Sequence, residues 1–388
     1  MDLIQGNYEM PGIQRSDVVT VFTANGLFCA SFWFGTMGKK WSLPKALREL
    51  GTYQPASGGL ILMGIFLFVL GMMTFAVPCN FNPVVMFDGL TADRWNAPWA
   101  RGAMGGWNAI IEHLVYFGYL LPTVSAMLFR RHGLKGMSGW GILLLSGIFF
   151  SFVAQGGSRR IVGACFLAAI ILIVLDMPKL RYHHLLLTGL FVFGLLWTLQ
   201  VLLISRSIQG GGRGRMSAAA SYVTDTLTGK ISTKASALTV DDNFYRQAQV
   251  ASIIPKTHPY IYFDYITYVL ARPIPRALWK NKPVDGGFAI HYFFGQGASL
   301  STSVVGELYM SWGVLACMMG GWLIGRWAGL GHDLFYSIPG SFGGLIYGFI
   351  TTWLLVGFRS MQELVLFSYP LLALIVMSRY IRNFTRTG

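Results

Sequence analysis

The sequence has little charge for its length. Asp, Glu, Lys and Arg make up 12 % of its 388 residues, whereas hydrophobic residues make up 54 %. So few charged side chains cannot solvate the surface of a globule of this size, and the composition excludes an ordinary water-soluble domain. It indicates an integral membrane protein.

Cysteines and familiar catalytic motifs are also scarce. The chain has no GxSxG, HExxH or Walker motif and no DxD pair, which argues against a serine hydrolase, a zinc protease or an ATPase. We therefore expect neither a metal nor a cofactor. Four cysteines lie in or beside apolar runs without CxxC spacing, which predicts small packing residues rather than a disulfide or a zinc site. They are Cys29, Cys79, Cys165 and Cys317.

Long apolar runs dominate the chain. Most have about 18 to 25 residues, the length of a helix that crosses the hydrocarbon core of a bilayer, and they lack the alternation of barrel strands. We predict an all-α polytopic membrane protein of about 9 to 11 transmembrane helices, forming a single integral membrane domain over residues 1–388. Nine spans are expected near residues 17–36, 57–79, 106–128, 138–154, 161–175, 185–204, 302–324, 336–355 and 364–377.

The widest gap between these runs, residues 205–300, predicts one large loop. Near its end, residues 258–283 combine a tyrosine-rich stretch, too short to span a bilayer, with Pro273, Pro275 and several basic residues. Aromatic rings favour the headgroup level of a membrane, so this part is expected to be an interfacial or re-entrant segment. The two prolines would fix Arg272 and Arg276 relative to the membrane surface.

Basic residues in the short loops predict the orientation. Cytoplasmic loops are enriched in Lys and Arg, and four basic clusters follow the first, third, fifth and ninth runs, which all end on one side. The C-terminus is therefore expected in the cytoplasm, with the N-terminus and the large loop outside. The clusters are Lys39, Lys40, Lys45 and Arg48; Arg130, Arg131 and Lys135; Lys179 and Arg181; and Arg379, Arg382 and Arg386.

Several arginines fall on the opposite, external side. Arg159 and Arg160 lie in a tight turn between the fourth and fifth runs, and Arg359 lies between the eighth and ninth; Arg272 and Arg276 belong to the large loop. Such arginines either anchor helix ends by reaching to the membrane surface or bind phosphate oxygens through two parallel hydrogen bonds. The sequence leaves both interpretations open.

Four short motifs surround the large loop: GGSRR at 156–160, RPIPRALWKNKP at 272–283, STSVVGELYMSWG at 301–313 and GFRS at 357–360. In this order they resemble the bacterial O-antigen and exopolysaccharide repeat-unit polymerases. Ser360 departs from the glycine that follows the arginine in many members. The resemblance implies a glycosyltransferase of the bacterial inner membrane that joins oligosaccharides carried on undecaprenyl diphosphate into a surface polysaccharide, at the outer face. It also implies membrane lipids, a flippase and a chain-length regulator as partners.

The charge pattern suits this chemistry. The leaving group of such a donor is a diphosphate, and arginines can stabilise the negative charge that develops on it without a metal. We expect five arginines to form this diphosphate clamp, with Arg276 and Arg359 also acting in catalysis. They are Arg159, Arg160, Arg272, Arg276 and Arg359.

A polymerase also needs a group that accepts the proton of the attacking sugar hydroxyl. Glu307, expected near the external end of the seventh span, is the first candidate because a carboxylate inside a membrane segment is rarely without function. It could equally be a buried carboxyl that only bonds neighbouring helices or pairs with an arginine. Weaker candidates for a base or for the cavity wall are His291, Asp264, Glu112 and His113.

Two other functions compete with the polymerase. An O-antigen ligase would use the same donor and similar arginines, and sequence chemistry cannot separate the two. A transporter or flippase for an anionic lipid-linked glycan would instead show charges near the bilayer midplane and two similar halves. Nucleic-acid binding is not expected, although the net charge is +14, because the basic residues are divided between the two faces.

Overall fold

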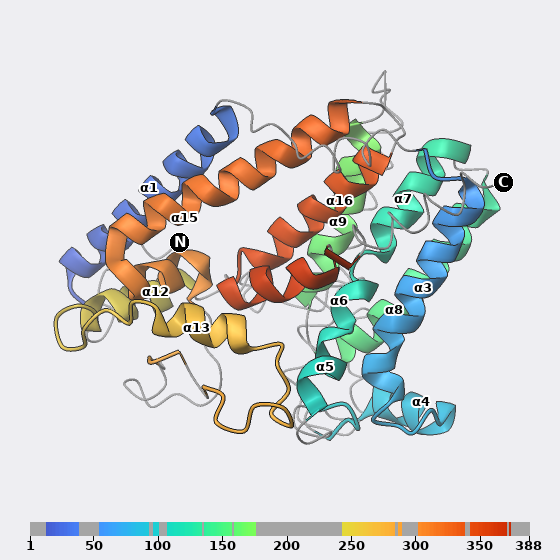
Figure 1. Cartoon of the computed structure of the whole chain (residues 1–388), viewed down its shortest axis with the longest axis horizontal. Helices are drawn as coiled ribbons and strands as arrows, with labels where there is room; N and C mark the ends of the chain where they lie inside the picture. Colours follow the sequence, from blue (N-terminus) through green and yellow to red (C-terminus); the bar gives the residue numbers. More distant parts are fainter. Residues whose placement is uncertain are drawn as a thin grey trace, which may run out of the picture.

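The computed structural model describes residues 13–38, 54–92, 96–100, 107–133, 136–156, 159–175, 243–283, 286–288, 302–337, 342–370 and 372–373. All regular secondary structure in these ranges is helical (Figure 1). The helices are α1 (Arg15–Met37), α3 (Ser57–Ala76), α4 (Pro83–Thr91), α5 (Asn108–His113), α6 (Val115–Gly118), α7 (Leu121–His132), α8 (Met137–Gln155), α9 (Arg159–Leu175), α12 (Asn243–Ile253), α13 (Asp264–Ala271), α15 (Ser303–Ser337) and α16 (Phe342–Gly357). Residues 361–370 form one more helix.

Five helical stretches in the described chain are long and apolar enough to cross a membrane. The helical, membrane-type fold is thus confirmed, whereas the predicted number of 9 to 11 spans is not. The five are Arg15–Met37, Ser57–Ala76, Ala109–His132, Met137–Gln155 and Ser303–Asp333, and the shorter apolar helices Arg160–Leu175 and Phe342–Gly357 match two further predicted spans. The predicted span at 185–204 lies outside the described residues, as do the N-terminal part of the large loop and most basic clusters.

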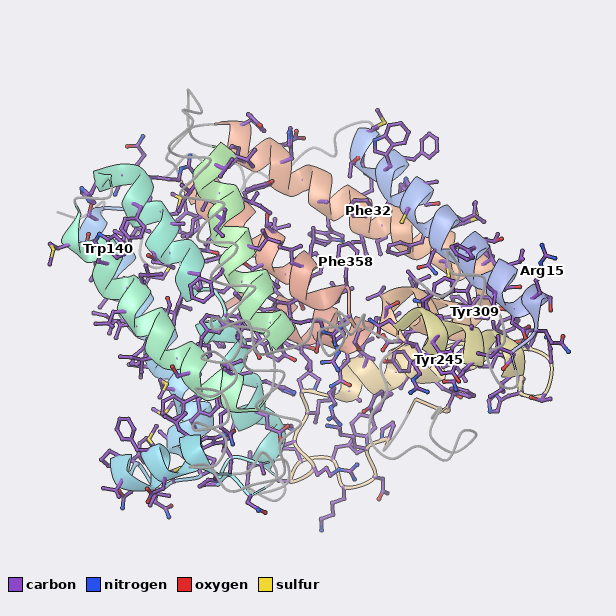
Figure 2. The ribbon with its side chains drawn as sticks, turned by 180° about the vertical axis from the view of Figure 1, so that it is seen from behind. Arg15, Phe32, Trp140, Tyr245, Tyr309 and Phe358 are labelled. Atoms are coloured by element: carbon purple, nitrogen blue, oxygen red, sulfur yellow. The ribbon has the colours of Figure 1, made fainter. Side chains whose placement is uncertain are left out.

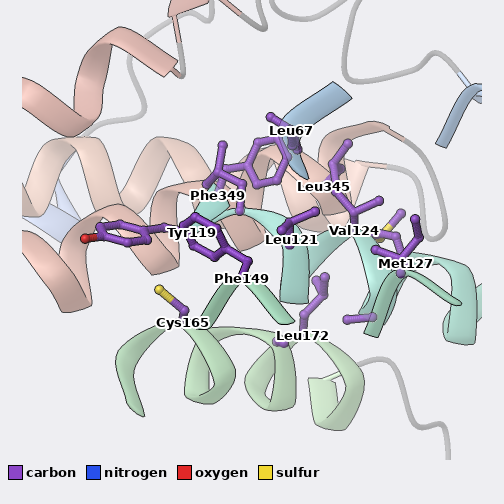
Figure 3. Packing of buried hydrophobic residues seen from close by; sticks show 14 of the residues in the cluster. Leu67, Tyr119, Leu121, Val124, Met127, Phe149, Cys165, Leu172, Leu345 and Phe349 are labelled. Atoms are coloured by element: carbon purple, nitrogen blue, oxygen red, sulfur yellow. The ribbon is translucent and has the colours of Figure 1, made fainter. Parts of the chain in front are cut away.

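The helices form two packed groups. One hydrophobic core joins α3, α7, α8, α9 and α16 around rings such as Phe149 and Phe349 (Figure 3). The other joins α1, α12, α13 and the first part of α15. Cys165 is buried in the first core and Cys317 in the second, and both are free thiols, which agrees with their predicted role as packing residues.

The closest helix pair is α1 with α15, which run side by side in Figure 1. Gly321, Gly325 and Gly329 of α15 face the backbone of α1 at Phe28, Phe32 and Thr36, respectively. Both sets advance by four residues in the same chain direction, so the two helices are parallel. Glycine spaced in this way lets two backbones approach to a distance that any Cβ would prevent. Two parallel helices that both cross a bilayer would enter it from the same side.

The predicted seventh span is not one straight helix. The backbone of α15 leaves helical geometry at Trp312 and Gly313, where Gly313 has φ +66° and ψ −150°. At this break the Met310 and Ser311 carbonyls accept hydrogen bonds from the large loop. The donors are the amides of Ile261 and Tyr262, each at 3.1 Å. Residues 303–311 therefore form a short helix that turns away from the rest of α15, and Glu307 lies on this short part.

Two helices, α4 and α12, were not predicted. Asn82 caps α4 by accepting a hydrogen bond from the Val84 amide, and Pro83 occupies the first helical position. Together these residues are a common helix start signal, which a search for long apolar runs does not detect. The α12 helix lies in the large loop and packs on α1 and α15. The side chain of Gln247 on α12 links α1 to the start of α15, since it accepts a hydrogen bond from Asn25 and donates one to the Thr302 carbonyl.

Candidate functional site

Two motifs far apart in the sequence meet at the turn between α16 and residues 361–370. The Ser360 hydroxyl donates to Glu307 Oε1 at 2.9 Å, and the Met361 amide donates to Glu307 Oε2. The Val304 amide in turn donates to the Phe358 carbonyl at 3.2 Å. Because Met361 begins a helix, the carboxylate of Glu307 lies at a helix N-terminus, where backbone amides favour an anion. These hydrogen bonds hold the SVVGE motif against the GFRS motif.

Tyr265 of α13 completes the surroundings of Glu307. Its hydroxyl lies close to the side chains of Glu307 and Ser360. Burial and the nearby Glu307 carboxylate raise the pKa of Tyr265 far above its ordinary value, so the phenol stays protonated and can donate. Glu307 is only 5 % exposed and receives hydrogen bonds from protein groups on several sides. This geometry favours the second of the two interpretations of Glu307, a buried carboxyl that bonds neighbouring helices.

The same turn is also held by aromatic contacts. The Phe358 ring meets Phe28 and Phe32 of α1 edge-on, with ring centroids 6.2 and 5.9 Å apart. Figure 2 shows Phe32 and Phe358 facing each other between α1 and α16. Edge-to-face pairs of this kind add about 0.5 to 1.5 kcal/mol beyond their burial. Phe358, just before Arg359, therefore packs against α1, whereas Ser360 and Met361, just after it, bond to Glu307 of α15.

Arg359 lies at a cavity of about 200 Å³ that we call the arginine cavity. The N-terminal residues of α9 contribute Arg160 to its wall, and the helix of residues 361–370 contributes Glu363. Arg359 Nη1 lies 3.6 Å from Glu363 Oε1, four residues further along the chain. Two arginines that the sequence places in separate tight turns thus share one cavity, together with a carboxylate. The full lining is Arg160, Ile161, Asn243, Leu355, Val356, Phe358, Arg359 and Glu363.

Arg272 and Arg276 belong to a second basic group, after α13. Lys282 Nζ donates to the carbonyls of Arg272 and Ile274 at 2.7 and 2.8 Å, so it ties the proline-containing turn together. Burial and the positive charges of Arg272 and Arg276 lower the pKa of Lys282. The Arg272 guanidinium also lies over the ring of Tyr268, 5.7 Å from its centroid.

The other predicted residues are dispersed. His113 lies close enough to Arg272 and Lys282 for their positive charges to act on its imidazole ring. The adjacent Glu112 is half-buried on α5. Asp264 is exposed in the first turn of α13, where a carboxylate is favourable near the positive end of the helix dipole. The side chain of Arg159 and the whole of His291 lie outside the described residues. Within the described ranges, no group of three His, Cys, Asp or Glu side chains could hold a metal ion.

Sequence reasoning missed Glu363, Tyr265 and Lys282. For Glu363 the available signal was its spacing of four residues from Arg359, which is the spacing of ion pairs across one helical turn. Tyr265 is one of several tyrosines in its segment, and only the packing of α13 distinguishes it.

Three of the four motifs come together in the structure. The GFRS turn and the SVVGE segment meet in space, and the GGSRR motif supplies Arg160 to the cavity that Arg359 lines. Comparison with protein-family models, with curated proteins and with solved structures finds no match for this chain.

Proposed function

We propose that this protein is a membrane glycosyltransferase that polymerises oligosaccharide repeat units carried on a polyprenyl diphosphate, at the outer face of a bacterial inner membrane. The observation that carries the proposal is the arginine cavity. Arg160 at the start of α9 and Arg359 just after the end of α16 lie close together, and both line a cavity large enough for a phosphate group. Two guanidinium groups that converge on one cavity favour an anionic ligand.

The reaction would proceed by displacement at the anomeric carbon of the donor. A hydroxyl of the acceptor sugar forms the new bond to this carbon, while the bond from carbon to the diphosphate oxygen breaks. The electron pair of that bond leaves with the diphosphate, whose developing charge Arg160 and Arg359 would stabilise. The proton of the acceptor hydroxyl must move to a base, and the carboxylate of Glu363 lines this cavity.

Glu307 takes a different role in this proposal from the one expected first. Its two oxygens already accept hydrogen bonds from Ser360 and Met361, the Tyr265 hydroxyl lies close by, and the side chain is almost fully buried. We propose that it positions the turn that carries Arg359, rather than accepting the substrate proton. The second basic group, with Arg272 and Arg276, would then bind the phosphates or sugars of the acceptor strand.

The test is the glycan profile of cells that lack this protein and carry a plasmid copy of one variant. Wild type restores the ladder of long chains. Arg359→Ala and Arg160→Ala should lose it, with single repeats still transferred to the final acceptor. Arg359→Lys should recover little, because lysine cannot form the paired hydrogen bonds of a guanidinium. Exposed Arg15 at the start of α1 offers a matched control, and Arg15→Ala should keep the ladder.

The same gel distinguishes the competing functions. Long chains that accumulate on the lipid diphosphate in the deletion strain would indicate a ligase. Unpolymerised precursor on the cytoplasmic face would indicate a transporter. A full ladder in the Arg160→Ala and Arg359→Ala double variant would refute the role of the arginine cavity.

A further inference from the structure

A second cavity lies between α1, α15 and α16. Its volume is about 610 Å³, and we call it the central cavity. Phe358 and Leu355 line both this cavity and the arginine cavity, so the two are direct neighbours separated by these side chains. In Figure 2, Phe358 and Phe32, which both line the central cavity, lie in the space between the two groups of helices.

The wall of the central cavity combines apolar and polar side chains. Phe32, Ile350 and Leu354 are among its apolar residues. Its residues on and just after α16 extend from Tyr347 to Phe358, and the helical part from Tyr347 to Leu355 spans about 12 Å at the rise of an α-helix. Arg326, His332 and Asp333 of α15 also line the cavity. The wall is therefore mostly apolar, with a few charged or titratable side chains from α15.

A polyprenyl diphosphate has an anionic head and a long hydrocarbon tail. If Arg160 and Arg359 hold the head, the tail must leave the arginine cavity through a neighbouring apolar space, because contact of isoprene units with water or with charged side chains is unfavourable. The central cavity is such a space, and it shares a wall with the arginine cavity. We therefore infer that the central cavity binds the isoprenoid tail of the donor. This inference rests on the proposed function, because it takes the head site from it.

Another groove competes for this role. It lies beside the break in α15 and has a volume of about 670 Å³, with walls from Phe34, Trp312, Leu315 and Leu323. This lateral groove is the more apolar of the two, as expected of a surface that contacts ordinary membrane lipids. It shares no lining residue with the arginine cavity, however. Continuity with the head site therefore assigns the donor tail to the central cavity.

The experiment is photolabelling of the full chain in lipid nanodiscs. The probe is an isoprenoid diphosphate that carries a diazirine at the far end of its tail, and mass spectrometry locates the labelled peptides. We expect label on the walls of the central cavity, at 347–354 and 326–333, and competition by unlabelled isoprenoid diphosphate. Ala328→Phe narrows the central cavity and should reduce this labelling about tenfold, a loss of about 1.4 kcal/mol. Leu323→Phe in the lateral groove is the matched control and should leave it unchanged.

Two results would overturn the inference. One is label concentrated on the lateral groove. The other is equal labelling of the central cavity by a photoreactive fatty acid that the isoprenoid diphosphate does not displace, which would identify the occupant as bulk lipid. The assay needs no sugar and no polymerisation, so it separates the two proposals. If the central cavity is labelled specifically but the Arg160→Ala and Arg359→Ala variants still form polymer, only the proposed function is refuted. If polymer formation depends on these arginines but the label lies outside the central cavity, only this inference is refuted.

Discussion

The hydroxyl of Ser360 donates a hydrogen bond to the carboxylate of Glu307 at 2.9 Å, across 53 residues of sequence. This bond and the neighbouring one from the Met361 amide fix the turn that carries Arg359 to the short helix before the break in α15. The position of the half-buried Arg359 guanidinium thus depends on a buried carboxylate that is not its ion-pair partner. Arg359 instead lies 3.6 Å from Glu363.

Removal of Glu307 should therefore destabilise the turn. In Glu307→Ala the Met361 amide and the Ser360 hydroxyl lose a buried acceptor, which costs about 1 to 3 kcal/mol per unsatisfied group. Ser360→Ala removes one donor and should cost about 1 kcal/mol. We expect the double variant to be less destabilised than the sum, by about 0.5 to 3 kcal/mol, in thermal unfolding of the purified protein. Strictly additive losses would show that the two side chains are not coupled.

Glu363 should affect the chemistry rather than the fold. Glu363→Gln keeps the size of the side chain but cannot accept the acceptor proton, so polymer formation should fall by about 100-fold or more. Its thermal unfolding should stay close to that of wild type. Unchanged polymer synthesis by Glu363→Gln, measured with purified protein and lipid-linked repeat units, would exclude Glu363 as the base.

The glycines of α15 should be needed for its contact with α1. A Cβ added at Gly325 would lie too close to the Phe32 carbonyl, so Gly325→Ala should separate the helices and cost about 1 to 3 kcal/mol. Gly26 of α1 is the matched control, since nothing lies within 4 Å of its added Cβ. There, alanine should stabilise the helix by up to about 1 kcal/mol. Equal melting temperatures for the two variants would contradict the packing.

The break in α15 gives a second matched pair. Gly313 and Gly133 both have φ +66°, a conformation that L-residues avoid, so alanine at either site should cost about 1 to 3 kcal/mol. An added Cβ at Gly313 would also lie 2.8 Å from the Tyr260 hydroxyl, whereas at Gly133 it would meet nothing. Gly313→Ala should therefore be the more destabilising of the two in thermal unfolding. Relief of this excess in Gly313→Ala with Tyr260→Phe would confirm that the hydroxyl is the obstacle.

Lys282 should give the stability of the protein a measurable pH dependence. The folded state lowers the pKa of Lys282 from 10.5, so the unfolded chain binds more protons in the interval between the two values. Stability relative to Lys282→Met should therefore rise as the pH increases through this interval. Denaturation in detergent from pH 7 to 10.5 checks the sign. If the stability of wild type relative to Lys282→Met fell as the pH increased, the folded state would instead favour the charged form of Lys282.

The sequence by itself determined the helical membrane class and the existence of most of the described apolar helices. Hydrophobic length is a local property, because each span must satisfy its own backbone hydrogen bonds. The same local signals identified Arg160, Arg359 and Glu307 as unusual. They could not reveal the break at Trp312 and Gly313, because the residues that stabilise it, Ile261 and Tyr262, come from a distant loop.

Only the tertiary structure decided which of these residues meet. It placed Arg160 and Arg359 at one cavity, enclosed Glu307 among donors, and set Arg272 and Arg276 in a separate group. It also added Glu363, whose position in the wall of that cavity depends on the orientation of the helix after the GFRS turn. Packing between helices fixes such relations through close backbone contacts and buried hydrogen bonds, and neither follows from the pattern of any single span.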